Sequence, residues 1–192
     1  MTKDEIRKNI LTKRNGLSKD EVLDKSRKIF EKLTDMSVYQ KAQKVLIYAS
    51  MSTEVITDDI IVDALSKGKK VFCPKCTDIK NGKMEFVRID SLDQLVKGYF
   101  GIREPVIKDD SEIYGNIGDN DGDIQNSVVI MPLVAFDDEN NRIGYKGGYY
   151  DRFLERFADI STIALAFEIQ RSFDIIPSES HDIKPQIVIT EL

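Results

Sequence analysis

Lys44-Val-Leu-Ile-Tyr-Ala-Ser50 is the stretch that decides the fold class, because it is a near-continuous apolar run. Such a run is typical of a strand that is buried on both faces, as in a parallel sheet. Strands that alternate with helices along a chain predict βαβ units and a mostly parallel sheet, which is the α/β class. The pattern predicts further strands at 70–73, 84–89, 128–131, 162–167 and 186–190, and helices at 2–15, 18–33, 57–67, 91–97 and 149–156.

Local signals fix several of these boundaries. Thr2 is placed to cap the first helix, and Ser18 forms a capping box with Glu21 at the start of the second. Gly68 follows the helix at 57–67, where a glycine commonly ends a helix. The stretch 106–126 is rich in Asp, Gly and Asn, and we expect it to be a surface excursion. No linker or internal repeat divides the sequence, so residues 1–192 are expected to form one domain.

The composition limits the classes of function. With 33 acidic and 28 basic side chains and a net charge of -5, the chain lacks the broad basic footprint of a dedicated nucleic-acid binder. No apolar run approaches the roughly 20 residues that span a bilayer, and 1–14 lacks the apolar core of a signal peptide. We therefore expect a cytoplasmic protein with no nucleic-acid or membrane partner. One His and two Cys exclude a multi-His metal centre, a disulfide scaffold and a four-cysteine zinc site.

The strongest chemical signal is the segment Arg142-Ile-Gly-Tyr-Lys-Gly-Gly-Tyr-Tyr-Asp151-Arg152 before a predicted helix. Glycines ahead of a helix let backbone N–H groups approach an anion, and Arg can grip a phosphate through two donors. Asp151 is a candidate ligand of Mg²⁺, which takes one or two carboxylates together with substrate phosphates. The segment is neither a Walker A motif nor a GxGxxG motif. The alternative is a glycine-rich connector whose tyrosines belong to the core.

Two further segments are candidates for ligand contact. Lys3, Arg7 and Arg14 fall in one narrow sector of the first helix, beside apolar positions. This stripe either faces a ligand or lays its long stems over the edge of the core. Glu54 follows the end of the strand at 44–50, where ligands bind in open α/β sheets, although it is also acceptable as an ordinary loop acid.

Three other motifs are better explained as ordinary structural or surface features than as functional sites. Cys73 and Cys76 have the spacing of a redox pair or zinc half-site, but no helix follows them and further zinc ligands are lacking. The acidic run 119–123 lacks the glycine that a calcium loop needs at its sixth position. His181 has no recognisable nucleophile as a partner, and its neighbour Asp182 is a second candidate metal carboxylate.

Together these segments resemble the 5-formyltetrahydrofolate cyclo-ligase (methenyltetrahydrofolate synthetase) family. The resemblance covers nearly the whole chain in order, and the glycine and tyrosine block before Asp151 is its most specific element. It implies a three-layer, Rossmann-like domain, similar to sugar-phosphate isomerase and CoA-transferase folds. The other matching segments are Lys3 to Arg7, Ser50-Met-Ser-Thr-Glu54-Val-Ile-Thr57, Gly101-Ile-Arg-Glu104-Pro105, Val129-Ile-Met-Pro132-Leu-Val-Ala-Phe136-Asp137, Ala164-Leu-Ala-Phe167-Glu168 and Ile176-Pro177 with His181-Asp182-Ile183.

The resemblance also implies an activity: closure of 5-formyltetrahydrofolate to 5,10-methenyltetrahydrofolate with consumption of MgATP, by an enzyme expected to be a monomer. Phosphoryl transfer requires positioning and charge neutralisation more than a protein nucleophile, which suits a chain with one His. Carried over to this sequence, the ATP contacts are Lys3, Arg7, Arg142, Ile143, Gly144, Tyr145, Lys146, Gly147, Gly148, Tyr149 and Tyr150. Asp151 and Asp182 would hold Mg²⁺, and Ala49, Glu54 and Phe100 would contact the folate.

Lys146 departs from the family pattern, which usually has a glycine at this position. A non-glycine residue there needs a negative φ or must tolerate a strained positive one. The alternatives to the cyclo-ligase activity are a sugar-phosphate isomerase or CoA-transferase-like enzyme that uses Glu54 without nucleotide, and a non-catalytic nucleotide-binding module.

Overall fold

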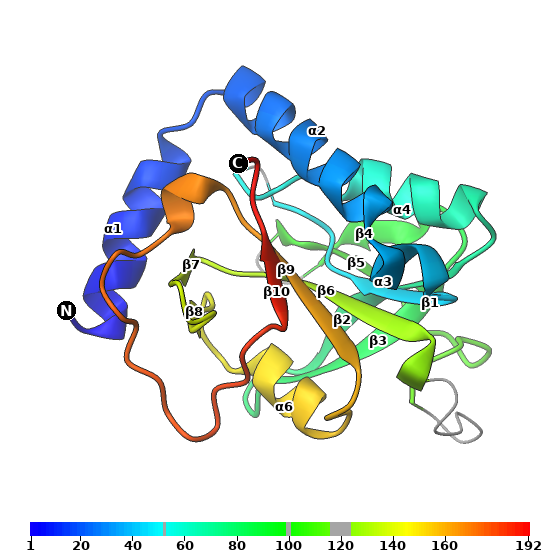
Figure 1. The fold of residues 1–192 in the computed structure, drawn as a ribbon. Helices are drawn as coiled ribbons and strands as arrows, with labels where there is room; N and C mark the ends of the chain where they lie inside the picture. Colours follow the sequence, from blue (N-terminus) through cyan, green and yellow to red (C-terminus); the bar gives the residue numbers. More distant parts are fainter. Residues whose placement is uncertain (52, 99–100, 116–123) are drawn as a thin grey trace.

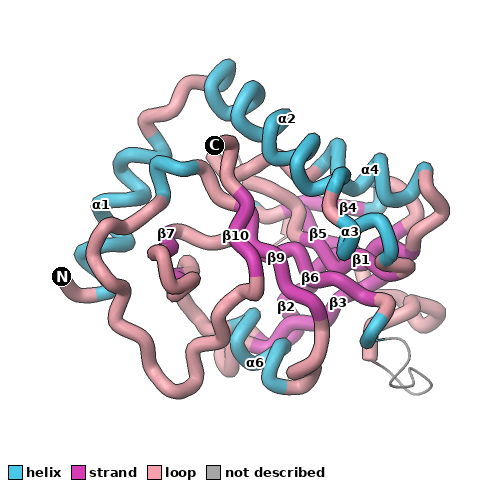
Figure 2. Tube along the Cα trace, viewed as in Figure 1, coloured by secondary structure: helices cyan, strands magenta, loops and turns pink. Residues whose placement is uncertain are grey.

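A six-stranded sheet of order β10-β9-β6-β1-β2-β3 organises the chain (Figures 1 and 2). The structure is a computed structural model that describes residues 1–51, 53–98, 101–115 and 124–192. Neighbouring strands are parallel except for β3, which runs antiparallel to β2, so the predicted mostly parallel sheet is confirmed. The strands are β1 (Lys44–Ile47), β2 (Lys70–Asp78), β3 (Lys83–Ile89), β6 (Ser127–Pro132), β9 (Ser161–Leu165) and β10 (Ile187–Ile189).

Helices cover both faces of this sheet, which gives the three layers. In β1, Val45 and Ile47 pack toward one apolar cluster and Leu46 toward another, because successive side chains of a strand point to opposite faces. The first cluster lies under α2 (Lys19–Asp35), α3 (Ser37–Lys41) and α4 (Asp58–Ser66), and the second lies under α6 (Tyr149–Glu155) (Figure 1). All four residues of β1 are buried, as the apolar run predicts.

The order of the strands fixes where a ligand can bind. The chain leaves β1 through α4 and returns as β2 on one side, while β6 lies on the other side of β1. Connections that leave two neighbouring parallel strands in opposite directions open a crevice at the carboxyl ends of those strands. Tyr48 and Ala49 follow β1 at this point, and Pro132 ends β6.

Helix α1 (Lys3–Asn15) lies beside the sheet and packs on a separate two-stranded unit of β7 (Ala135–Phe136) and β8 (Arg142–Ile143). Ile6 and Ile10 supply the apolar face of α1. The buried carboxylate of Asp137 holds the β7–β8 turn, since it accepts hydrogen bonds from the backbone N–H groups of Glu139, Asn141 and Ile176. These bonds outweigh the effect of burial and lower the pKa of Asp137.

The predicted caps are confirmed, while some predicted boundaries are wrong. Thr2 and Ser18 both form capping boxes, with Glu5 and Glu21 as the partners. The predicted helix at 91–97 is a 3-10 turn (Leu92–Gln94) followed by β4 (Leu95–Lys97), because β4 pairs with the distant β5 (Arg103–Pro105). The predicted surface excursion at 106–126 contains Tyr114, which is buried against Phe72.

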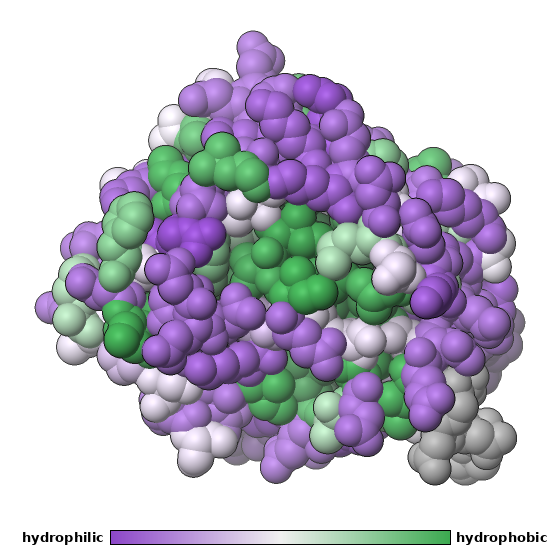
Figure 3. Space-filling view, in the orientation of Figure 1, coloured by the Kyte–Doolittle hydropathy of each residue, from purple (hydrophilic) through white to green (hydrophobic). Residues whose placement is uncertain are grey.

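Most of the face drawn in Figure 3 is polar, and apolar residues reach the surface near the middle of that view. Among the described residues, no helix has the length and apolar character needed to cross a membrane.

Phe153→Ala is expected to lower the free energy of unfolding by about 3–5 kcal/mol, because it removes a buried ring and leaves a cavity. The Phe153 ring lies 4.7 Å from Phe86 and 4.9 Å from Phe157, measured between centroids. Urea denaturation measures the effect. Phe173→Ala is the control, since Phe173 is 95% exposed and its removal is expected to change stability little. Equal effects of the two substitutions would contradict the packing described here.

Candidate active site

A cavity of about 910 Å³ lies at the carboxyl ends of β1, β2 and β6. It brings together every described residue that the sequence analysis assigned to ATP, Mg²⁺ or folate. Phe100 lies outside the described residues. The predicted residues that line the cavity are Lys3, Arg7, Ala49, Glu54, Arg142, Ile143, Gly144, Tyr145, Lys146, Gly147, Gly148, Tyr149, Tyr150, Asp151 and Asp182.

Two residues of the basic stripe of α1, Lys3 and Arg7, face this cavity, while the third, Arg14, does not line it. Lys3 and Arg7 are one helical turn apart, and both line the cavity. The Nε atom of Arg7 donates to the carbonyl of Gly144 over 2.9 Å, which ties the helix to the glycine-rich segment. Arg14 is buried farther along α1 and donates to the hydroxyl groups of Tyr145 and Thr53.

The glycine-rich segment owes its shape to positive φ angles. Gly147 has φ 90° and Gly148 has φ 60°, and a Cβ atom on Gly147 would lie only 2.6 Å from Cε2 of Tyr149. Lys146 adopts φ 150°, so of the two conformations open to a non-glycine residue here, the strained positive one is observed. Its side chain is 70% exposed and lies 3.6 Å from the carboxylate of Asp4.

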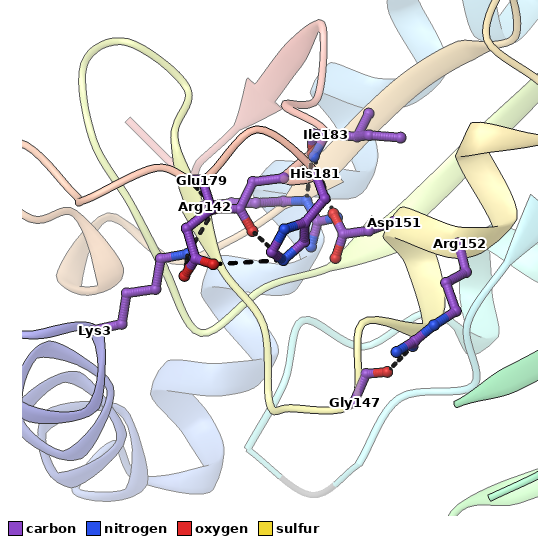
Figure 4. A network of polar contacts seen from close by, with 9 residues as sticks. Lys3, Arg142, Gly147, Asp151, Arg152, Glu179, His181 and Ile183 are labelled. Carbon is purple, nitrogen blue, oxygen red and sulfur yellow. Dashed lines mark hydrogen bonds and ion pairs between the residues drawn. The ribbon is translucent and has the colours of Figure 1, made fainter. Parts of the chain in front are cut away.

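A buried arginine joins this segment to the C-terminal part of the chain (Figure 4). The Arg142 side chain is only 6% exposed, and its Nη2 atom lies 2.6 Å from Oδ1 of Asp151. Its Nε atom donates to the carbonyl of Ile183 over 2.9 Å, and the Ile183 N–H donates back to Asp151. The three groups form a closed ring of hydrogen bonds, so β8, α6 and the segment around Ile183 are fixed together.

Lys3 contacts two acidic residues of the C-terminal segment, Glu179 and Asp182, which come just before Ile183. Its Nζ atom lies 2.6 Å from Oδ2 of Asp182 and 3.2 Å from Oε1 of Glu179. Burial acts against the charge of both Lys3 and Asp182. The hydrogen bonds between them nevertheless raise the pKa of Lys3, and together with the Glu179 N–H they lower the pKa of Asp182.

The donor set suits magnesium better than a metal held by protein alone. Among the described residues, no group of three or more His, Cys, Asp or Glu side chains is arranged to hold a metal ion. Mg²⁺ needs only one or two carboxylates when phosphate oxygens and water supply the rest. Asp151 and Asp182 both line the cavity, and the hydrogen bonds of Asp151 use only its Oδ1 atom among the described residues. The residues present therefore fit a phosphate-bound Mg²⁺ ion.

Another part of the cavity wall is largely apolar and contains a buried acid. Glu54 is 5% exposed and accepts hydrogen bonds from the Met51 N–H, over 2.7 Å, and from the Tyr145 hydroxyl. Burial raises the pKa of Glu54 despite these bonds. The sequence analysis missed the apolar lining, although the position of Tyr48 and Met51 after the end of β1 was a usable signal. That lining consists of Tyr48, Met51, Pro74, Met84, Ile102 and Pro132.

The cavity is also lined by Glu104, Cys76 and His181, to which the sequence analysis assigned no role in ATP, Mg²⁺ or folate binding. Glu104 is 4% exposed and pairs with Lys75 over 2.5 Å, a partner from another strand. Cys76 lines the cavity while Cys73 is buried in the core, and burial raises the pKa of both thiols, which disfavours the reactive thiolate. His181 is 70% exposed and lies 3.8 Å from Glu179, as a lining residue at the cavity mouth.

Comparisons with known proteins give one consistent result. A family model described as the 5-formyltetrahydrofolate cyclo-ligase family matches residues 1–191. A probable 5-formyltetrahydrofolate cyclo-ligase of Caenorhabditis elegans is 34% identical over 79% of this chain and 71% of its own length. The mouse 5-formyltetrahydrofolate cyclo-ligase is 29% identical over 97% of this chain and 92% of its own length.

Two solved structures share the fold. The 5,10-methenyltetrahydrofolate synthetase of Aquifex aeolicus superposes with a TM-score of 0.79 and 31% identity, over 100% of this chain and 90% of that one. A 5,10-methenyltetrahydrofolate synthetase of Mycoplasma pneumoniae gives a TM-score of 0.72 over the full length of both chains. At 21% identity, this second likeness shows the fold alone.

Glu54→Gln is expected to gain stability relative to the wild type as the pH rises from about 4.5 to about 7. A carboxyl whose pKa is raised in the folded state favours folding below its ordinary pKa of 4.5, and this contribution is lost as the pH rises through the raised value. Glutamine does not titrate and escapes the loss. Urea unfolding across this pH range measures the difference, with Glu139→Gln, at a 61% exposed side chain, as the control. A difference that stays constant with pH would contradict the raised pKa.

Proposed function

Because the chain belongs to the 5-formyltetrahydrofolate cyclo-ligase family, we propose that it converts 5-formyltetrahydrofolate and ATP into 5,10-methenyltetrahydrofolate, ADP and phosphate. The observation that carries this proposal is one cavity that joins a basic helix face, a glycine-rich segment and a buried acid from distant parts of the chain. A sugar-phosphate isomerase or CoA-transferase-like enzyme is not favoured, because the family match and both curated relatives point to the cyclo-ligase.

The reaction needs activation because a formamide oxygen is a poor leaving group. In the proposed route the formyl oxygen attacks the γ-phosphorus of ATP and ADP departs. The N10 nitrogen then attacks the activated formyl carbon. The C–O bond breaks, N10 loses its proton, and the oxygen leaves as part of inorganic phosphate. Each step depends on alignment and charge neutralisation, so no covalent protein nucleophile is required.

Lys3, Arg7 and the segment from Arg142 to Tyr150 are proposed to bind ATP. Lys3 and Arg7 supply positive charge from α1, and the glycines let backbone N–H groups approach the phosphates. The hydrogen bond from Arg7 to Gly144 supports this assignment, because it holds the helix and the segment on one side of the cavity.

Asp151 and Asp182 are proposed to hold Mg²⁺ together with the ATP phosphates. When bound, the ion would neutralise charge that develops on the transferred phosphoryl group. Asp151 is held in place by Arg142 and the Ile183 N–H, so its position does not depend on the ion.

Glu54 and Ala49 are proposed to contact the folate. A flat heteroaromatic ring with N–H groups suits an apolar pocket that contains one buried acceptor. The lining by Tyr48, Met51 and Met84 supports this end of the cavity as the folate end. Phe100 remains a predicted stacking residue, and a cytoplasmic, monomeric enzyme without nucleic-acid or membrane partners remains the expectation from the sequence.

The activity is tested by mixing the purified protein with 5-formyltetrahydrofolate and MgATP. Formation of the methenyl product, followed by its absorbance, is the expected result, and omission of ATP should abolish it. No product from correctly folded protein would overturn the proposed function. Product without ATP would also overturn it, since the route requires phosphorylation of the formyl oxygen.

Lys3→Ala and Arg7→Ala are each expected to raise the KM for ATP about tenfold, on the scale of one hydrogen bond to a charged group. The KM for the folate should change much less, because both residues lie at the proposed nucleotide end. Lys8→Ala is the matched control, as Lys8 lies on the same helix but is exposed and lines no part of the cavity. An ATP dependence that Lys3→Ala and Arg7→Ala leave unchanged would remove α1 from the site.

A further inference from the structure

Every cation that lines the cavity is paired with a carboxylate of the chain itself. Lys3 contacts Glu179 and Asp182, and Arg142 contacts Asp151. Asp4 lies beside both remaining cations, Arg7 and Lys146. A nucleotide that enters the cavity must therefore compete with internal carboxylates for each positive group.

The ion pairs differ in how easily a ligand can replace the carboxylate partner of the cation. The Arg142 side chain is 6% exposed, and separation of a buried pair is costly because it leaves an uncompensated charge. Glu179 is 63% exposed, and pairs with exposed partners contribute little to stability. The contact of Lys3 with Glu179 is thus one that a ligand can replace, as are the contacts of Arg7 and Lys146 with Asp4, whose side chain is 73% exposed. Lys3 differs from the other exposed cations because it holds two carboxylates, those of Glu179 and Asp182.

A backbone turn holds these two carboxylates on Lys3. The Glu179 N–H donates to Oδ2 of Asp182 over 2.7 Å, and the Asp182 N–H donates to the Glu179 carbonyl over 3.0 Å. Oδ2 of Asp182 is also the atom that lies 2.6 Å from Nζ of Lys3. Figure 4 shows Lys3 and Glu179 close to Arg142 and Asp151, at the proposed phosphate end. The acids therefore lie where a triphosphate would bring its own negative charge.

We propose that Glu179 and Asp182 make the site selective for metal-bound nucleotide over bare ATP, an inference that rests on the proposed function. In the absence of a divalent cation, both acids stay on Lys3 and repel the triphosphate. A divalent cation that arrives with the phosphates neutralises part of their charge and offers Asp182 a second partner. Lys3 is then free to contact the phosphates. Glu179 is a specificity-determining residue in this scheme, because it opposes bare ATP without being one of the proposed metal ligands.

The test is calorimetric titration of the whole protein with ATP, without folate, once in excess EDTA and once in excess MgCl₂. The wild type is expected to bind ATP more weakly in EDTA than with Mg²⁺. Glu179→Gln should tighten binding in EDTA about threefold to fivefold, the scale of one partly exposed ion pair, and leave MgATP binding nearly unchanged. Asp182→Asn should also tighten binding in EDTA but weaken MgATP binding, so its two effects have opposite signs.

Asp138→Asn is the matched control. Asp138 pairs with Arg171 over 2.6 Å, is 83% exposed and does not line the cavity, so the same loss of one negative charge should change neither affinity. Affinities of Glu179→Gln in EDTA within twofold of the wild type would overturn the inference, as would an equal gain in Asp138→Asn. If the folded wild type binds no ATP even with Mg²⁺, the proposed function itself fails. If only the inferred selectivity is wrong, the wild type will still bind ATP in the presence of Mg²⁺.

Discussion

The buried guanidinium of Arg142 is the interaction on which the site depends. It hydrogen-bonds to the Ile183 carbonyl and to Asp151, and Ile183 hydrogen-bonds to Asp151 in turn. One side chain thereby connects β8, α6 and the C-terminal segment, which are distant in the sequence. The glycine-rich segment runs from Arg142 to Asp151, and both of these residues belong to the ring of hydrogen bonds. The ring therefore fixes the two ends of the segment. The surrounding sheet supplies the crevice, and Arg142 determines which groups line its phosphate end.

The charges of the cavity explain why a chain with one His suits the proposed chemistry. Lys3, Arg7 and Arg142 supply positive groups, and the carboxylates of Asp4, Asp151, Glu179 and Asp182 pair with them. Activation of a formyl oxygen by phosphorylation needs charge neutralisation and alignment, and such groups provide both. Glu54 is buried in the wall of the same cavity, and burial raises its pKa.

Much of the fold could be predicted from the sequence, because the signals of its elements are local. The apolar run of β1 and the capping residues Thr2 and Ser18 depend only on near neighbours. The helix predicted at 91–97 is wrong because part of this segment depends on a distant contact. Leu95 belongs to a strand because it pairs with Pro105. Glu179 was missed for the same reason, as its partner Lys3 lies 176 positions away. Asp182 became a candidate through its place beside His181 and through the resemblance to a family, but neither signal predicted its contact with Lys3.

The central claim is that one cavity aligns ATP with the formyl group so that the formyl oxygen leaves as phosphate. The most direct measurement is the fate of that oxygen. The protein would be supplied with 5-formyltetrahydrofolate labelled with ¹⁸O in its formyl group and with unlabelled MgATP, and the released phosphate would be analysed by mass spectrometry. The account predicts one ¹⁸O atom in each phosphate that accompanies a methenyl product. Unlabelled phosphate, with the label released into water, would contradict it.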